Sequence, residues 1–407
     1  MTEPFVLAGA SQVVTNDSSH GGLAGVLANG AVVVSGSGVA WVGPEADLPS
    51  EWADARRIDL EGRTLIPGFV DAHTHLVFAG DRSDEFAQRM AGRSYQEIAA
   101  EGGGILATVE ASRRAGFEEL VSLTRRRMQA MLAQGTTTLE VKSGYGLSTE
   151  HELNQLRAAA AAASGLPITI RRTFLGAHTV PSDYRGDPAG YVDLVVEEML
   201  PACHTEADYC DVFVEEGAFG VDDARRILTA AGELGLRARV HAEQLGHSGG
   251  AQLAAELAAA SADHLDHVTA EDAAALAGAG TSAVLVPGAS FQLRGSQAPG
   301  PMLWDAGVTV ALATDCNPGT SYIESMTFVV ALGVVQMGLT PEQALWAATR
   351  GGALSLGLED RGCIVPGSRA DLVVLDAPSY LHLPYRPASR LVSRVFCGGE
   401  EVDVDRL

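Results

Sequence analysis

The segment VDAHTHLVFAG, Val70–Gly80, places two histidines two residues apart directly after a short apolar run. Successive side chains of a β-strand alternate between its two faces, so His73 and His75 are expected on the same face. Two histidines on one face could bind a metal ion or could fill a corner of a protein core. Any further metal ligands have to come from elsewhere in the sequence, so their positions decide the question.

Composition and charge restrict the class of protein. The 407 residues are 46% apolar and 19% charged, which is typical of a globular protein with one large domain or two ordinary ones. A formal net charge of −23 argues against nucleic acid and anionic membranes as partners, because both are themselves negatively charged.

Cysteine usage and the apolar runs indicate the compartment. The five cysteines are odd in number and lack a C-x-x-C spacing, which argues against a disulfide framework. We see no signal peptide at the start and no run approaching the roughly 20 apolar residues of a membrane span. We therefore expect a cytoplasmic protein that does not associate with a membrane.

The middle of the chain alternates short apolar segments with longer helical ones. Eight candidate strands fall within residues 65–75, 136–146, 168–178, 209–219, 236–244, 261–267, 281–290 and 308–319. Helical candidates between them include residues 117–135 and 221–235. This alternation predicts parallel strands joined by helices, and eight repeats favour a closed (β/α)₈ TIM-like barrel. An open doubly wound sheet is the alternative, weakened because no G-x-G-x-x-G follows the first strand.

Both ends of the chain have the pattern of β structure, with branched apolar runs interrupted by glycine and proline. Neither end is long enough to be a stable domain alone, so we expect them to combine into a small β-sandwich beside the barrel. The predicted division assigns residues 1–64 and 356–407 to this composite sandwich and residues 65–355 to the barrel.

Polar residues end most of the predicted strands, where the catalytic groups of a barrel gather. They are His73 and His75 on the first strand, Tyr145 on the second, His178 on the third, His241 on the fifth, His264 and His267 on the sixth, and Asp315 on the eighth. A single buried histidine is usually a core residue, but five strands of eight ending in histidine or aspartate argue against chance. Imidazole and carboxylate ligands suit Zn²⁺ or Fe²⁺, and such a metal would activate a water near neutral pH.

Longer motifs around these residues resemble the amidohydrolase superfamily and, more narrowly, the imidazolonepropionase family. They are DAHTHLVFAGDRSDEF, GGGI, EVKSGYGL, TFLGAHTVP, SADHLDH and ATDCNPGTS, between about Pro67 and Ser321. The resemblance implies metal-dependent hydrolysis of the ring C–N bond of 4-imidazolone-5-propanoate to N-formimidoyl-L-glutamate, in L-histidine degradation. It also implies a small-molecule substrate, a homodimer, and one Zn²⁺ or Fe ion per subunit.

The resemblance also implies roles for individual residues. The implied metal ligands are His73, His75, His241 and Asp315; the implied catalytic groups are Asp315 and His264; and the implied substrate-binding positions are Arg82, Tyr145, His178, Gln244, Asn317, Gly319 and Thr320. Arg82 suits the propanoate tail, because a guanidinium binds a carboxylate through two parallel hydrogen bonds. From the residues alone, Asp315 could instead be the N-cap of a helix.

Two positions separate this chain from other amidohydrolases. Gln244 stands where related deaminases, and some members of the resembled family, have a proton-carrying glutamate. This weakens a guanine-type deaminase and leaves proton transfer to Asp315 and His264. Lys142 lies on the second predicted strand, whereas a carboxylated lysine bridging two metals, as in some cyclic amidohydrolases, belongs to the fourth. We therefore expect one metal, with Lys142 as a buried partner of Glu140 or a pocket residue. A binding protein without activity would have a damaged ligand set, and none of the expected ligands is missing.

Neighbouring residues allow weaker expectations. Asp263 or Asp266 could orient an imidazole, as carboxylates behind metal-binding histidines do. Arg171 or Arg172 could add positive charge near the substrate. The glycine run Gly102–Ile105 indicates unusual backbone angles or a close approach to ligand.

Overall fold

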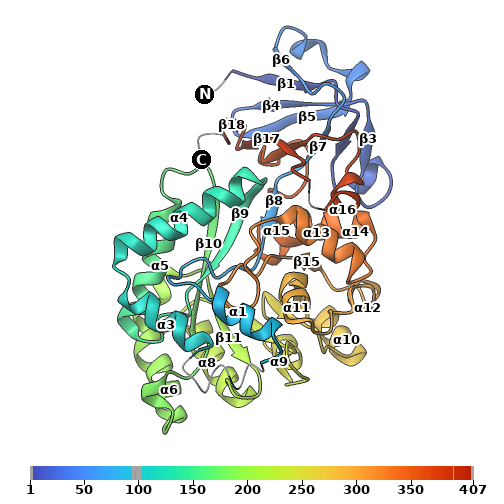
Figure 1. The fold of residues 1–407 in the computed structure, drawn as a ribbon. Coiled ribbons are helices and arrows are strands. Elements are labelled where there is room, and N and C mark those ends of the chain that lie inside the picture. Colours follow the sequence, from blue (N-terminus) through green and yellow to red (C-terminus); the bar gives the residue numbers. More distant parts are fainter. Residues whose placement is uncertain (1–2, 94–96, 98–102, 388, 405–407) are drawn as a thin grey trace.

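The computed structural model describes residues 3–93, 97, 103–387 and 389–404, and shows a barrel beside a smaller β domain (Figure 1). The barrel strands, in order around the sheet, are β8 (Phe69–Asp71), β9 (Thr136–Lys142), β10 (Thr169–Ala177), β11 (Tyr209–Val214), β12 (Arg237–Ala242), β13 (Ser261–His264), β14 (Ser282–Leu285) and β15 (Val310–Leu312). Neighbouring strands are parallel throughout. Spatial order follows chain order without a reversal, which confirms the barrel and excludes the doubly wound sheet.

The barrel closes where the chain leaves its first and last strands. Thr74 forms a parallel bridge with Cys316. The amide of Asp315 donates to the carbonyl oxygen of His73 at 3.0 Å, and the amide of His75 donates to that of Cys316 at 3.0 Å. The backbone hydrogen bonds that close the barrel therefore belong to the residues expected to bind metal.

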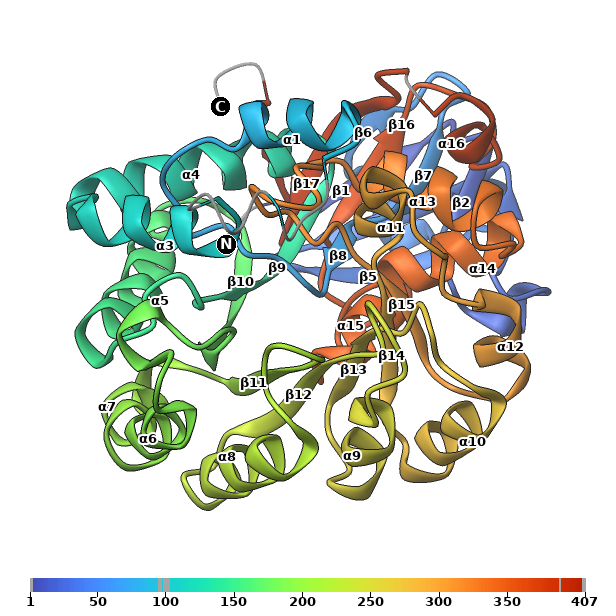
Figure 2. The same cartoon turned by 60° about the horizontal axis from the view of Figure 1, so that its bottom comes forward.

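Helices surround the barrel (Figure 2), and α4 (Phe117–Ala133) and α8 (Val221–Glu233) confirm the two predicted from sequence. The other α-helices of the described chain are α1 (Ser83–Met90), α3 (Ile105–Arg114), α5 (Thr149–Ala163), α6 (Pro188–Leu194), α7 (Leu200–Cys203), α9 (Gly250–Glu256), α10 (Ala270–Ala279), α11 (Pro287–Leu293), α12 (Gly300–Asp305), α13 (Met326–Val335), α14 (Pro341–Trp346), α15 (Gly352–Ser355) and α16 (His382–Tyr385). Buried residues of α8 recur every three or four positions, so one face packs against β11 and β12. Within the described ranges, no helix combines the length and the apolar character that crossing a membrane requires.

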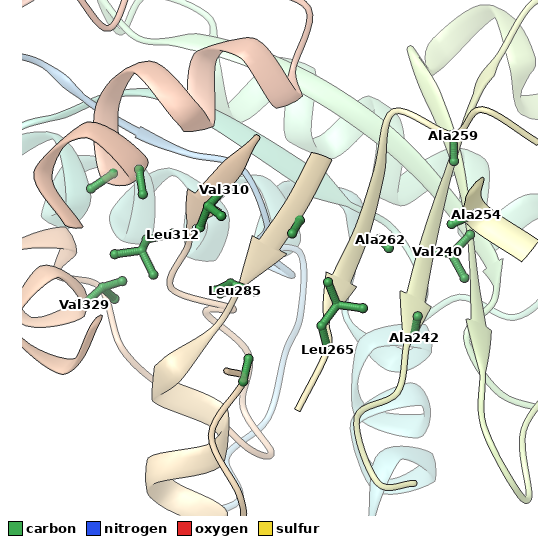
Figure 3. Close-up of a cluster of buried hydrophobic side chains, with 14 of the residues drawn as sticks. Val240, Ala242, Ala254, Ala259, Ala262, Leu265, Leu285, Val310, Leu312 and Val329 are labelled. Atoms are coloured by element: carbon green, nitrogen blue, oxygen red, sulfur yellow. The ribbon is translucent and has the colours of Figure 1, made fainter. Parts of the chain in front are cut away.

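The layer between strands and helices is apolar, while polar and ionisable side chains fill the barrel interior. Figure 3 shows small and branched side chains of β12 to β15 in this layer, among them Val240, Ala242, Leu285 and Leu312. On β12, the intervening Arg239 and His241 make polar contacts inside the barrel. The two-residue repeat of a strand therefore separates packing residues from reactive ones.

Both ends of the chain build the side domain, in which blue and red segments interleave (Figure 1). One sheet has the order β5 (Gly38–Pro44), β4 (Gly30–Ser35), β1 (Phe5–Ala8), β6 (Arg56–Asp59), and the other β18 (Glu400–Val402), β17 (Val392–Cys397), β16 (Leu372–Leu375), β7 (Thr64–Pro67), β2 (Gln12–Val14), β3 (Val26–Ala28). The sheets share an apolar core in which the rings of Phe5 and Phe396 lie 6.0 Å apart. This arrangement confirms the predicted composite sandwich.

The prediction of a single strand over residues 65–75 is wrong. Its beginning is β7, which pairs with β16 and β2 in the side domain, and its continuation is β8, which pairs with β9 in the barrel. One apolar run covers both strands, and apolar character does not show which sheet a residue joins. The division into residues 1–64, 65–355 and 356–407 stays a prediction.

Gly68 connects the two domains, and a Cβ added there would lie 2.4 Å from Oγ1 of Thr137. We expect Gly68→Ala to lower the free energy of unfolding by about 1–3 kcal/mol through overpacking. Gly232→Ala is the matched control, because Gly232 lies in α8 with nothing within 4 Å of an added Cβ. Gly232→Ala should leave the free energy of unfolding unchanged or raise it by up to about 1 kcal/mol. Denaturant unfolding measures both, and equal effects would contradict the close approach.

Candidate metal centre

Four side chains converge at the carboxyl end of the barrel: His73, His75, His241 and Asp315. The Nε2 atom of His75 lies 3.2 Å from that of His73 and 3.3 Å from that of His241. Oδ1 of Asp315 lies 3.4 Å from Nε2 of His73 and 3.4 Å from Nε2 of His75. A tetrahedral ion with ligand bonds of 2.0–2.1 Å would hold its ligand atoms about 3.3–3.4 Å apart. The four separations match the spacing of ligands around one small transition-metal ion. His73 belongs to two sets of possible ligand atoms that lie within 4.8 Å of one another, one with His75 and His241 and the other with His264 and Asp315.

All four side chains are buried, and burial shifts the pKa of each one. Burial lowers the pKa values of His73, His75 and His241 well below their usual range, so the rings are neutral and offer lone pairs. Burial raises the pKa of Asp315 well above that of an exposed aspartate. Its buried Oδ1 atom has no hydrogen-bond partner among the described residues. A metal ion between these atoms would satisfy all of them at once.

Carboxylates lie behind two of the histidines, and one carboxylate fixes the tautomer of a ring. Oδ2 of Asp263 lies 2.6 Å from Nδ1 of His73, which places the proton on Nδ1 and leaves Nε2 as the acceptor. Oδ2 of Asp211 lies 3.0 Å from Nδ1 of His241 without forming a hydrogen bond to it, and Oδ1 of Asp211 accepts from the amide of His241 at 3.2 Å. The expectation that Asp263 or Asp266 orients an imidazole holds for Asp263. Asp266 accepts from a serine hydroxyl instead, and burial raises its pKa to about 7.

A buried charge network supports these carboxylates from below. Nζ of Lys142 lies 2.9 Å from Oε1 of Glu140 and 2.8 Å from Oδ2 of Asp211. Burial opposes its charge, but Asp211 and Glu140 outweigh that effect and raise the pKa of Lys142. Nη2 of Arg239 lies 3.3 Å from Oδ2 of Asp263. The expected pairing of Lys142 with Glu140 is confirmed, and an ammonium held by carboxylates is not a metal-bridging carbamate.

Sequence reasoning missed two members of this network, Asp211 and Arg239. Both occupy inward positions on predicted strands, since Asp211 is opposite Arg239 in the β11–β12 pairing and Arg239 is two residues before His241. A charged residue at the inward register of a central strand was the signal that could have identified them.

A left-handed backbone conformation places the side chains of His264 and Asp315 at the site. His264 follows Asp263 directly, and strand alternation alone would send their side chains to opposite sides. His264 has φ of 76°, and its ring lies 5.3 Å from that of His73. Asp315 has φ of 51°, and the next α-helix, α13, begins eleven residues later, so the helix N-cap reading is wrong. His267, the second histidine of residues 261–267, is exposed and outside the cavity.

A cavity of about 540 Å³ lies over the converging ligands, at the carboxyl end of the barrel where such sites form. The residues predicted from sequence that line it are His75, Arg82, Tyr145, His178, His241, Gln244, His264, Asp315, Asn317, Gly319 and Thr320. His73 lies behind them, fully buried. Gly103, Gly104 and Ile105 of the glycine run also line the cavity, whereas Gly102 lies outside the described residues. Arg185, which sequence reasoning did not select, lines the cavity as well.

Aromatic side chains form one wall of the cavity. The ring of His178 stacks on that of His75 with centroids 5.0 Å apart, and Tyr145 lies 5.4 Å from His178. Nδ1 of His178 donates to the carbonyl oxygen of Gly144 at 3.0 Å, which leaves Nε2 as an acceptor. Burial lowers the pKa values of His178 and His264 to about 4, so both rings are neutral.

Hydrogen bonds of one side chain, that of Asn317, hold the loop after Asp315 in place. Nδ2 of Asn317 donates to the carbonyl oxygen of Asp315 at 2.7 Å, and Oδ1 accepts from the amides of Gly319 and Thr320 at 2.8 Å each. Asn317 thus fixes the backbone that carries the aspartate, in addition to lining the cavity.

Other candidates lie elsewhere. Arg171 and Arg172 form ion pairs with acidic residues just before β11 and do not line the cavity. Glu243 has φ of 53° and accepts from the amide of Gly249 at 2.9 Å. Its carboxylate therefore caps the start of α9, while the neighbouring Gln244 lines the cavity.

Comparison with known sequences adds an independent observation. The sequence pattern of the amidohydrolase family matches residues 64–402. The imidazolonepropionase of Streptomyces avermitilis is 52% identical over 378 residues, or 93% of this chain and 88% of that protein. The imidazolonepropionase of Mycolicibacterium smegmatis is 51% identical, covering 96% of this chain and 95% of its own. That of Streptomyces coelicolor is 49% identical, covering 98% and 99%.

Solved structures of lower identity share the fold. A zinc-bound adenosine deaminase from Xanthomonas campestris superposes with a TM-score of 0.73 at 22% identity, covering 98% of this chain and 92% of that one. A triazine hydrolase variant gives a TM-score of 0.75 at 18% identity, covering 100% and 98%.

The hydrogen bond between Asp263 and His73 leads to a testable prediction for this site. Asp263→Asn should weaken metal binding about 10–100-fold, because the ring of His73 loses the carboxylate that fixes its tautomer. Competition with a chelator measures the affinity. Asp266→Asn is the matched control, since Asp266 is three residues away and holds a serine. The prediction fails if a folded Asp263→Asn protein binds metal as tightly as the control.

Proposed function

The chain belongs to the amidohydrolase family and, within it, to the imidazolonepropionases, and on this premise we propose how its site performs the hydrolysis. The enzyme cleaves the ring C–N bond of 4-imidazolone-5-propanoate, and N-formimidoyl-L-glutamate is the product. The observation that carries the assignment is an identity near 50% over almost the whole length. It agrees with the site, where His73 and His75 contact both Asp315 and a further histidine at the cavity.

The metal would be held by His73, His75, His241 and Asp315. When bound, it supplies a Lewis acid that polarises a carbonyl and lowers the pKa of a coordinated water to about 7. We propose one Zn²⁺ or Fe ion per subunit, because imidazole and carboxylate donors suit both metals.

Two side chains are proposed to move protons. Water adds to the ring carbonyl carbon, and the carboxylate of Asp315, which lies among the ligand atoms, accepts its proton. The C–N bond then breaks, and the departing nitrogen takes up that proton, directly or through the neutral imidazole of His264. His264 also suits a hydrogen bond to the carbonyl oxygen as negative charge develops there. Gln244 cannot carry a proton, so its amide is assigned only to hydrogen bonding.

The cavity wall is proposed to hold the substrate. Arg82 binds the propanoate tail, while Tyr145 and His178 contact the ring, where Nε2 of His178 accepts from a ring N–H. The remaining proposed contacts are Gln244, Asn317, Gly319 and Thr320, all of which line the cavity.

Assembly and location complete the proposal. We propose a homodimer in the cytoplasm, with a small-molecule substrate and neither nucleic acid nor membrane as a partner. Light scattering of the purified protein would test the dimer.

A direct assay tests the reaction. Purified protein of known metal content is mixed with freshly made 4-imidazolone-5-propanoate, and the ring's ultraviolet absorbance is followed beside a chelator-treated sample. Metal-dependent loss with formimidoylglutamate as product is expected. No loss above the spontaneous rate in metal-loaded protein would reject the substrate, and purines and hydantoins would then test the deaminase and cyclic amidohydrolase alternatives.

Asp315→Asn should lose nearly all turnover, because an amide cannot accept the water's proton. Metal content is measured alongside kcat and restored by adding metal, so that a lost base is distinguished from a lost ligand. Full activity in this variant would reject the proposed base.

Arg82→Ala should raise KM about 10–100-fold, the loss expected for a hydrogen bond between charged groups. Arg171→Ala is the control, because Arg171 lies outside the cavity. Steady-state kinetics on both variants give KM, and an unchanged value for Arg82→Ala would remove this residue from the tail site.

A further inference from the structure

Glu152 is fully buried and lies behind the cavity wall rather than in it. It stands in the first turn of α5, just after the loop that leaves β9. Its Oε2 accepts from the amide of Gly144 at 3.0 Å, and its Oε1 accepts from the amides of Gly146 at 2.8 Å and Leu147 at 2.7 Å. One carboxylate therefore holds three backbone amides of the same short loop.

This loop also supplies the carbonyl oxygen that orients an imidazole of the cavity wall. Nδ1 of His178 lies 3.0 Å from the carbonyl oxygen of Gly144. A carbonyl oxygen can only accept, so this bond keeps the proton of the neutral ring on Nδ1 and leaves the lone pair on Nε2. Oε1 of Gln155, also in α5, accepts at 3.1 Å from the amide of Tyr145, which belongs to the same peptide group as that carbonyl. The peptide group that orients His178 is thus held at both of its ends.

The backbone of the loop needs this support. Leu147 has φ of 49°, which a residue with a side chain rarely adopts. A Cβ added to Gly144 would lie 2.8 Å from Nδ1 of His178, so the backbone approaches the imidazole closely. Nε and Nη2 of Arg113, in α3, donate to the carbonyl oxygens of Gly146 at 2.6 Å and Leu147 at 2.9 Å. Unfavourable backbone conformations persist where neighbouring groups hold them, and they are concentrated at functional sites.

We propose that Glu152 is a positioning residue for His178, an inference that rests on the proposed function. Glu152 holds the amides on both sides of the Gly144 carbonyl, and so fixes the point at which Nδ1 of His178 binds. It thereby sets the direction of Nε2, the atom assigned to a ring N–H of the substrate. Glu152 contacts neither Asp315 nor His264 through a hydrogen bond of the described chain, so it governs how the ring is held more than how its bond is broken.

Glu152→Gln tests the inference directly. A glutamine has one oxygen and one NH₂ group, so it cannot accept from the amides on both sides of the loop. We expect KM for 4-imidazolone-5-propanoate to rise about five- to tenfold, the loss of roughly one hydrogen bond to substrate, with kcat within about threefold. Glu150→Gln is the matched control, because Glu150 is an exposed acid in the same turn of α5 and should give wild-type kinetics. Metal content and denaturant unfolding are measured for every variant.

A double-mutant cycle separates positioning from simple support of the fold. If Glu152 acts through the imidazole, Glu152→Gln should change KM by less than about twofold in the His178→Ala background. An equal fold-change in both backgrounds would mean that Glu152 only supports the fold, and would overturn the inference. An unchanged KM in folded Glu152→Gln, or a loss confined to kcat, would overturn it as well. Wild-type protein inactive on the propanoate would instead reject the proposed function itself.

Glu152→Asp keeps the inference testable if Glu152→Gln does not fold. This variant retains the carboxylate but shortens the side chain by one methylene, so it cannot reach the amides on both sides of the loop. We expect KM to rise at least about twofold and the rise to disappear in the His178→Ala background. The same rise in both backgrounds, or no rise in either, would contradict the positioning role.

Discussion

The pairing of the first and last barrel strands is the constraint on which the site depends. Two backbone hydrogen bonds, from the amide of Asp315 to His73 and from the amide of His75 to Cys316, close the ring of strands. They also bring a carboxylate and two imidazoles from opposite ends of the barrel sequence to within 3.4 Å. The hydrogen bonds that close the barrel therefore also bring these candidate ligands together.

That geometry requires charges in the barrel interior, which in most proteins is apolar. Lys142 and Arg239 face the carboxylates of Glu140, Asp211 and Asp263, all fully buried. Removing charges from water is expensive, and a buried network is tolerated when each member has partners. Burial alone would raise the pKa of Asp263, but Arg239 and Lys142 outweigh it and lower that pKa, so this carboxylate stays ionised and the proton of His73 stays on Nδ1. Burial raises the pKa of Asp211. The strands supply rigid support, and the layer outside them supplies the apolar packing.

The substrate side is built differently, from loops and helix ends. Arg82, Gly104 and Gly319 come from three separate segments and meet around Glu85. The protein as a whole is strongly acidic, and the guanidinium of Arg82 at the cavity is paired with a local carboxylate, that of Glu85. The candidate metal ligands come from the ends of strands, whereas this part of the cavity wall comes from loops and helix ends.

Local periodicity and residue chemistry were enough to predict the barrel, the sandwich made from both ends, and the positions of His73, His75, His241 and Asp315 at strand ends. These features could be predicted because the two-residue repeat of a strand and the preference of metals for imidazole are local properties. Only the tertiary structure decided that the strand over residues 65–75 divides between two sheets. The same holds for the left-handed backbone at His264, the pairing of Lys142 with Asp211 and the contact of Glu85 with Arg82 and Gly104. Those features depend on which segments pack together, and distances between residues remote in the chain are set by the closed barrel rather than by local sequence.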